Sequence, residues 1–141
     1  MNISARNIWP GTVTHIETGA VNDVVSVKLR GGAVVTSVIT KNSVQRLGLK
    51  EGSQAMVVVK ASSVMLGLDI QPAKISARNV LPGTVKAIEP GVVNDVVTVD
   101  LAGGDLLCSV ITANSVKRLD LAPGKLVVGI IKASEVMLAT E

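Results

Sequence analysis

The chain of 141 residues contains two copies of one sequence unit, and this repetition constrains its fold more than any other feature. Residues 75–140 repeat residues 3–68 at a constant offset of 72 positions, without a gap and with about 38 identities in 66 aligned positions. Such a repeat predicts one structural unit used twice. We therefore expect a first domain at 1–68, a short linker at 69–74 and a second domain at 75–141.

Each unit has the pattern of five short strands with a short helix between the third and the fourth. Residues 23–29 alternate in polarity with a period of two, which is typical of a half-buried strand, and Gly31-Gly32 marks a hairpin. Val44 and Leu47 have helical spacing, and further apolar runs lie at 11–16, 34–40, 55–60 and 64–68. This order matches the OB-type Greek-key barrel. The predicted fold class is all-β with short helices, as two tandem five-stranded OB-fold barrels.

The composition excludes several classes of function. Phe and Tyr are absent and Trp9 is the only aromatic residue, so the core is built from Val, Ile and Leu, and a base-stacking platform for nucleic acid is poorly supported. One Cys and one His make neither a disulfide nor a zinc site. No apolar run reaches membrane-spanning length and no signal peptide opens the chain, so we expect a cytoplasmic protein without a membrane partner. The net charge of +3 is mildly basic and is compatible with an anionic partner.

Residues that differ between the copies cannot belong to a site that both copies share. This removes four candidates, namely His15, Trp9, Cys108 and Lys28, which align with Ala87, Leu81, Thr36 and Asp100. Without a shared His or Cys, neither copy offers a Ser-His-acid triad or a thiol nucleophile, and no catalytic residue is predicted. The repeated carboxylates Glu17, Glu89, Asp23 and Asp95 are interpreted as solvated loop charges.

A set of hydrogen-bond donors without any carboxylate is retained in both copies. Two cations and several hydroxyls suit a small oxyanion, since Arg presents a planar fork and Lys a point charge. The alternative is structural, with the hydroxyls as helix caps and the cations in surface ion pairs. The set consists of Ser4, Arg6, Asn7, Thr40, Ser43, Lys60 and Ser62, repeated as Ser76, Arg78, Asn79, Thr112, Ser115, Lys132 and Ser134.

A second candidate is a glycine-containing turn that also occurs in both copies. One interpretation is a plain turn, in which glycine permits positive φ and Asn accepts left-handed geometry. The other is an anion-binding nest made of consecutive backbone N–H groups. The turn comprises Gly19, Ala20, Val21 and Asn22, repeated as Gly91, Val92, Val93 and Asn94.

The motifs ISARN, PGTV, GAVN, SVIT and VVVKAS, in this order, resemble the Mop or TOBE domain of the molbindin family, a molybdate-binding OB-fold module. The likeness covers both units, as in two-domain molbindins of molybdate storage and homeostasis. It implies a homo-oligomer, a trimer resembling a hexamer of domains, that binds molybdate or tungstate. The implied sites between subunits use Ser4, Arg6, Thr40, Ser43, Lys60, Ala61 and Ser62, with Ser76, Arg78, Thr112, Ser115, Lys132, Ala133 and Ser134, the two alanines acting through their backbone N–H groups.

The resemblance also implies oxyanion sites on a threefold axis, lined by residues 19–22 and 91–94. Glu135, which replaces Ser63 in the second copy, is expected to weaken oxyanion binding there. Two other functions stay open from the residues alone: a single-stranded nucleic-acid-binding OB module, and a purely structural assembly module whose donors serve as caps and interface bonds.

Overall fold

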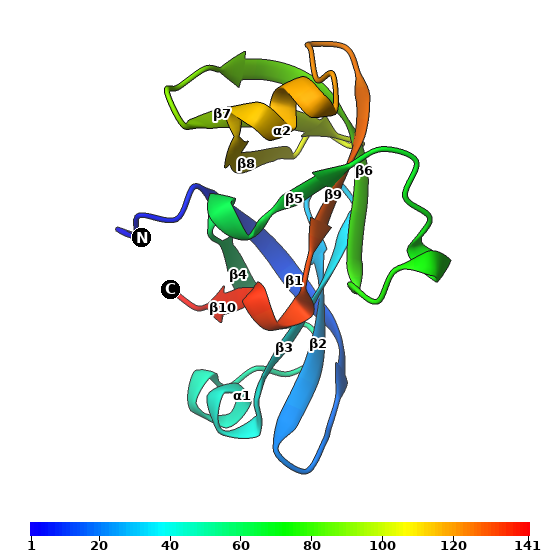
Figure 1. Cartoon of the computed structure of the whole chain (residues 1–141). Coiled ribbons are helices and arrows are strands. Elements are labelled where there is room, and N and C mark those ends of the chain that lie inside the picture. Colours follow the sequence, from blue (N-terminus) through cyan, green and yellow to red (C-terminus); the bar gives the residue numbers. More distant parts are fainter.

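The computed structural model describes all residues from 1 to 141, which form two similar halves (Figure 1). The first half contains β1 (Asn7–Glu17), β2 (Asn22–Leu29), β3 (Val34–Thr40), α1 (Lys41–Leu47), β4 (Gln54–Val59), the 3-10 turn η1 (Ala61–Ser63) and β5 (Met65–Gly67). After a 3-10 turn η2 (Pro72–Lys74), the second half contains β6 (Asn79–Glu89), β7 (Asn94–Leu101), β8 (Leu106–Thr112), α2 (Ala113–Arg118), β9 (Leu126–Ile131), the 3-10 turn η3 (Ala133–Glu135) and β10 (Met137–Ala139). The predicted fold class and the position of each helix are confirmed.

The last strand of each repeat lies in the sheet of the other repeat. One sheet has the order β10-β4-β1-β2-β3 and the other has the order β5-β9-β6-β7-β8. The sequence predicted five strands in each unit without indicating this exchange. β5 pairs antiparallel with β9 of the second repeat. Since only one residue separates η1 from β5, the chain crosses from one sheet to the other at η1.

Two buried serines fix the exchanged segments. Ser37 on β3 donates a hydrogen bond of 2.6 Å to the carbonyl oxygen of Val136, directly before β10. Ser109 on β8 donates an equivalent bond of 2.7 Å to the carbonyl oxygen of Val64, directly before β5. Since both hydroxyls are fully buried, these bonds supply partners that water cannot provide.

Two asparagines form a further link between the repeats. The side chain of Asn7 bonds both backbone groups of Cys108, at 2.8 Å to its oxygen and 2.7 Å from its nitrogen. Asn79 makes the same pair of bonds with the backbone of Thr36. The amides of Asn7 and Asn79 are therefore structural, which corrects their inclusion among the candidate oxyanion ligands.

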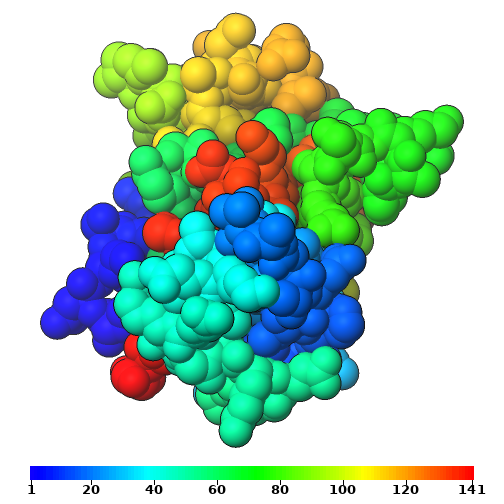
Figure 2. All heavy atoms as spheres, turned by 90° about the horizontal axis from the view of Figure 1, so that it is seen from below, coloured from blue at the N-terminus to red at the C-terminus, as the bar shows by residue number.

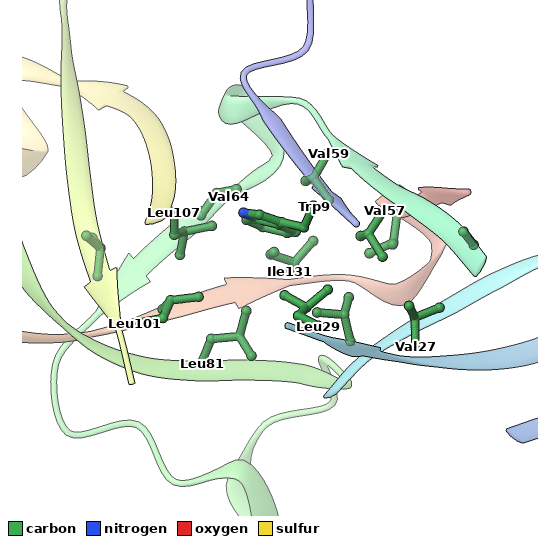
Figure 3. Packing of buried hydrophobic residues seen from close by; sticks show 14 of the residues in the cluster. Trp9, Val27, Leu29, Val57, Val59, Val64, Leu81, Leu101, Leu107 and Ile131 are labelled. Atoms are coloured by element: carbon green, nitrogen blue, oxygen red, sulfur yellow. The ribbon is translucent and has the colours of Figure 1, made fainter. Parts of the chain in front are cut away.

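A single apolar cluster fills the interior of both halves (Figure 3). Trp9 lies among residues of both repeats, with Val59 from β4 and Leu107 and Ile131 from the second half nearby. Its indole Nε1 donates a bond of 2.8 Å to the carbonyl oxygen of Leu106. The only aromatic side chain is thus a core residue that joins the repeats.

The helices mark opposite ends of the molecule, with α1 at one end and α2 at the other (Figure 1). Figure 2, viewed toward the end that carries α1, shows the N-terminal segment and the linker projecting from different sides.

The hairpin after β2 contacts the hairpin after β7. The N–H of Gly31 donates a hydrogen bond of 3.1 Å to the carboxylate of Asp105, and Gly103 lies so close to Gly31 that a Cβ on Gly103 would clash with the Gly31 carbonyl oxygen. Neither helix is long or apolar enough to cross a membrane.

Removing either asparagine side chain will destabilise the whole molecule. We expect Asn7→Ala and Asn79→Ala each to lower the free energy of unfolding by about 1–3 kcal/mol, since each leaves buried backbone groups without partners. Urea denaturation followed by circular dichroism measures this. The control is Asn42→Ala at the exposed start of α1; equal effects of all three substitutions would contradict the role assigned to the asparagines.

Candidate functional site

The first candidate site lies where β1 begins and β4 ends. Asn7 pairs with Val59, so the residues just before β1 and just after β4 are adjacent. They line a hollow of about 360 Å³ together with two side chains of the other repeat, Val110 and Met137. Its polar lining is formed by Ser4, Arg6, Lys60 and Ser62.

The second repeat forms an equivalent hollow of about 400 Å³ by the same register, in which Asn79 pairs with Ile131. Val38 and Met65 of the first repeat complete its wall. The polar lining is Ser76, Arg78, Lys132 and Ser134. Each hollow therefore draws its donors from one repeat and part of its apolar wall from the other.

The polar side chains of both hollows are free to bind a ligand. None of the eight makes a hydrogen bond or an ion pair within the chain, and all eight belong to exposed residues. No carboxylate lines either hollow. Each hollow thus has two cations and no carboxylate among its lining residues, which produces a positive local potential and favours an anion.

Backbone groups add to the donors at each hollow. Lys60 caps the 3-10 turn η1 and Ala61 is its first residue, so the leading N–H groups of this turn have no partner inside it. Ala133 occupies the same place in η3 after Lys132. Both alanines are buried in the linings of their hollows.

The four candidate residues at the helix starts lie outside the hollows of the chain, namely Thr40, Ser43, Thr112 and Ser115. Thr40 is the N-cap of α1, where its Oγ1 accepts a bond of 3.1 Å from the N–H of Ser43 and donates one of 2.8 Å to the Ser43 hydroxyl. Thr112 and Ser115 repeat this geometry at α2. Their capping role is thus established. Within one chain they do not line the hollows, although Thr112 lies two residues beyond Val110.

The two glycine-containing turns lie at opposite ends of the molecule, one beside each helix (Figure 1). Their valines are strongly exposed, at 71% for Val21, 100% for Val92 and 69% for Val93. A single chain therefore does not bring residues 19–22 and 91–94 into one site.

The geometry of these turns corrects two predictions. Asp23 is buried, and its carboxylate accepts a bond of 3.1 Å from the N–H of Gly19, so it is a structural residue and not a solvated charge. Asp95 is buried in the same way and accepts from Gly91 at 3.0 Å. The glycines are not at positive φ; a Cβ on Gly19 would lie only 2.2 Å from the Asn22 carbonyl oxygen, which is why a side chain does not fit.

The two repeats are not identical around the hollows. Glu135 follows Ser134, and its Oε2 lies 3.4 Å from the hydroxyl of Ser63, the residue that follows Ser62 in the first repeat. This contact joins the two 3-10 turns, because Ser63 is the last residue of η1 and Glu135 is the last residue of η3. That Glu135 weakens oxyanion binding in the second repeat stays a prediction, and its contact with Ser63 was not foreseen from the sequence.

Comparison with known proteins identifies the family. The model of the TOBE domain matches residues 3–66 and 75–138, so the chain belongs to the TOBE domain family. It is 41% identical over 139 residues to the molybdenum-pterin-binding protein MopA of Rhodobacter capsulatus, covering 99% of this chain and 52% of MopA. It is 48% identical over 69 residues to a probable molybdenum-pterin-binding protein of Haemophilus influenzae, covering 49% of this chain and all of that protein.

A solved structure matches the whole chain. The cytoplasmic molybdate-binding protein ModG, crystallised with molybdate bound, is 43% identical to it, with a TM-score of 0.94 and 100% of each chain covered. The chain spans about half the length of the longer curated relatives, which include MopA and the ModE regulators. The likeness thus extends over complete chains for ModG and over parts of the longer proteins.

The cations of the hollows are expected to contribute little to stability. Because Arg6 and Lys60 have no partner within the chain, Arg6→Ala and Lys60→Ala should each change the free energy of unfolding by less than about 0.5 kcal/mol. Chemical denaturation without added oxyanion measures this, with the adjacent Asn7→Ala as the destabilised reference. A loss as large as that of Asn7→Ala would show that these cations hold the fold together.

Proposed function

We propose that the protein binds and stores molybdate, with tungstate as an equivalent cargo, in intracellular molybdenum homeostasis and without catalysis. The observation that carries this proposal is the pair of carboxylate-free hollows, each with one Arg, one Lys and two hydroxyls that have no partner in the chain. The match to ModG over its full length supports the choice of molybdate. That protein is described as cytoplasmic, which supports the same location here.

The chemistry of the donor set favours a fully deprotonated oxyanion. Molybdate at neutral pH is a tetrahedral dianion without a proton, so every oxygen accepts hydrogen bonds. Monohydrogen phosphate carries a proton that needs an acceptor, and a lining without carboxylates disfavours it because a donor facing a donor loses a bond. Sulfate also lacks a proton, so size has to separate it from molybdate.

We infer that the complete sites form between copies of the chain. The hollows are open on one side, and the capped starts of α1 and α2 carry the remaining hydroxyls, which are Thr40, Ser43, Thr112 and Ser115. In a homotrimer, a neighbouring subunit supplies these helix starts to each hollow. The exposed turns at 19–22 and 91–94 then meet around the threefold axis and offer backbone N–H groups to further oxyanions.

The buried position of Trp9 argues against the nucleic-acid alternative. It is only 5% exposed, and no other aromatic side chain is available to stack on a base. A purely structural assembly module is disfavoured because eight polar side chains remain without partners in the hollows.

Replacing the arginine in both hollows will abolish molybdate retention at the inter-subunit sites. We expect Arg6→Ala with Arg78→Ala to lose these anions and to keep the subunit count, because neither guanidinium supports the fold. Native mass spectrometry after dialysis against molybdate reports subunits and anions together, with sulfate as the competing ion.

The matched control is Lys50→Ala with Lys86→Ala, which removes the same charge at exposed positions outside both hollows. It should retain the wild-type number of anions. An unchanged anion count in the arginine variant would show that these side chains are not ligands, and a wild-type protein that keeps no molybdenum would refute storage.

A further inference from the structure

Three polar side chains form a row across the outer face of the first sheet, far from the paired hollows. Thr12 on β1 pairs with Gln54 on β4 and with Lys28 on β2. Arg30 is the first residue of the turn after β2 and lines the same hollow as Lys28. The row borders a hollow of about 250 Å³ lined by Gly11, Thr12, Thr14, Lys28, Leu29, Arg30 and Gln54.

Both cations of this hollow lack partners. Lys28 and Arg30 are exposed, and their side chains make no hydrogen bond or ion pair within the chain. No carboxylate is among the lining residues. The hollow therefore offers an ammonium and a guanidinium two residues apart, an arrangement that matches an oxyanion.

Two hydroxyls of the hollow make hydrogen bonds of opposite direction. The Nε2 of Gln54 donates to Thr12 Oγ1 at 3.1 Å, which leaves the Thr12 hydrogen available to a ligand. Thr14 Oγ1 donates to the carbonyl oxygen of Ser26 at 3.3 Å, which leaves it as an acceptor. A ligand that contains both bare oxygens and one O–H group satisfies this pair.

The second repeat shows that the fold does not require these cations. The equivalent row consists of Leu126, Thr84 and Asp100, by the same strand register. Ala102 replaces Arg30, and Asp69 of the linker adds a second carboxylate to the matching hollow. One scaffold thus carries opposite charge at two equivalent places, so the basic character is a property of the first repeat alone.

We propose that the hollow at Thr12, Lys28 and Arg30 binds a tetrahedral oxyanion that carries a proton, of which inorganic phosphate is the simplest. Thr12 lies six positions after Arg6 along the chain, which is about 20 Å on an extended strand. This site is therefore distinct from the paired hollows, and its ligand belongs to the class that the paired hollows disfavour. The proposal does not depend on molybdate storage.

The test replaces the cations with their counterparts from the second repeat, which the scaffold accepts. Inorganic phosphate is titrated into the intact protein, with and without molybdate, and backbone amide shifts are followed by NMR. In the wild-type protein we expect saturable shifts at Thr12, Lys28 and Arg30. In Lys28→Asp with Arg30→Ala, we expect the affinity for phosphate to fall at least tenfold while molybdate retention stays unchanged.

The control variant, Arg46→Ala with Lys50→Asp, makes the same change in net charge at exposed positions outside the hollow and should bind phosphate within twofold of wild type. A reciprocal variant, Asp100→Lys with Ala102→Arg and Leu126→Gln, should create phosphate binding at the second hollow. The proposal is overturned if the first variant keeps wild-type affinity, if the control loses as much, or if molybdate displaces phosphate.

A simple alkyl phosphate monoester distinguishes free phosphate from a phosphoryl group on a larger molecule. The same amides should shift with either ligand, since the hollow is open to solvent. Tighter binding of inorganic phosphate supports the proposal, because the monoester at neutral pH is mostly a dianion without an O–H group to donate to Thr14. Binding of the ester as tight as that of inorganic phosphate, or tighter, overturns the requirement for a proton on the ligand. Shifts confined to Arg6 and Lys60 with both ligands would contradict the site.

Discussion

β5 and β10 each lie in the sheet of the opposite repeat, so neither barrel is complete without the other. The exchange places the 3-10 turns η1 and η3 at the junction of the halves, where Ser37 and Ser109 hold the exchanged segments through buried hydrogen bonds. The same junction forms both hollows, because each one has walls of Val110 and Met137 or of Val38 and Met65 from the other repeat. The exchange of β5 and β10 therefore completes both sheets and also forms both hollows.

Much of this architecture could be predicted from the sequence, because alternation with a period of two shows which residues face a core. It does not show which sheet a strand joins, so the destinations of β5 and β10 could not be read from residues 64–68 or 136–140. Asp23 and Asn7 were misjudged for a related reason. A polar residue next to a turn or a strand end has the same appearance in sequence whether it is solvated or bonded to buried backbone.

Aligning the two repeats selected the residues of the paired hollows, but it also removed a residue of the third hollow. It retained Arg6, Lys60 and their counterparts, which the structure gathers in equivalent hollows with free side chains. It also set aside Lys28, because residue 100 is Asp. That step is sound for a shared site, but it hides any site that only one repeat possesses. Strand register was needed to see that Lys28, Thr12 and Gln54 form a row.

The reciprocal exchange of edge strands also bears on why two repeats are joined in one polypeptide. An isolated repeat has to obtain its missing strand from a separate molecule, so its folding is bimolecular and depends on the protein concentration. A linker as short as residues 69–74 converts that encounter into an intramolecular one with an effective concentration in the millimolar range. Covalent fusion thereby makes closure of the barrels independent of expression level, and it frees each repeat to acquire charges that its twin does not share.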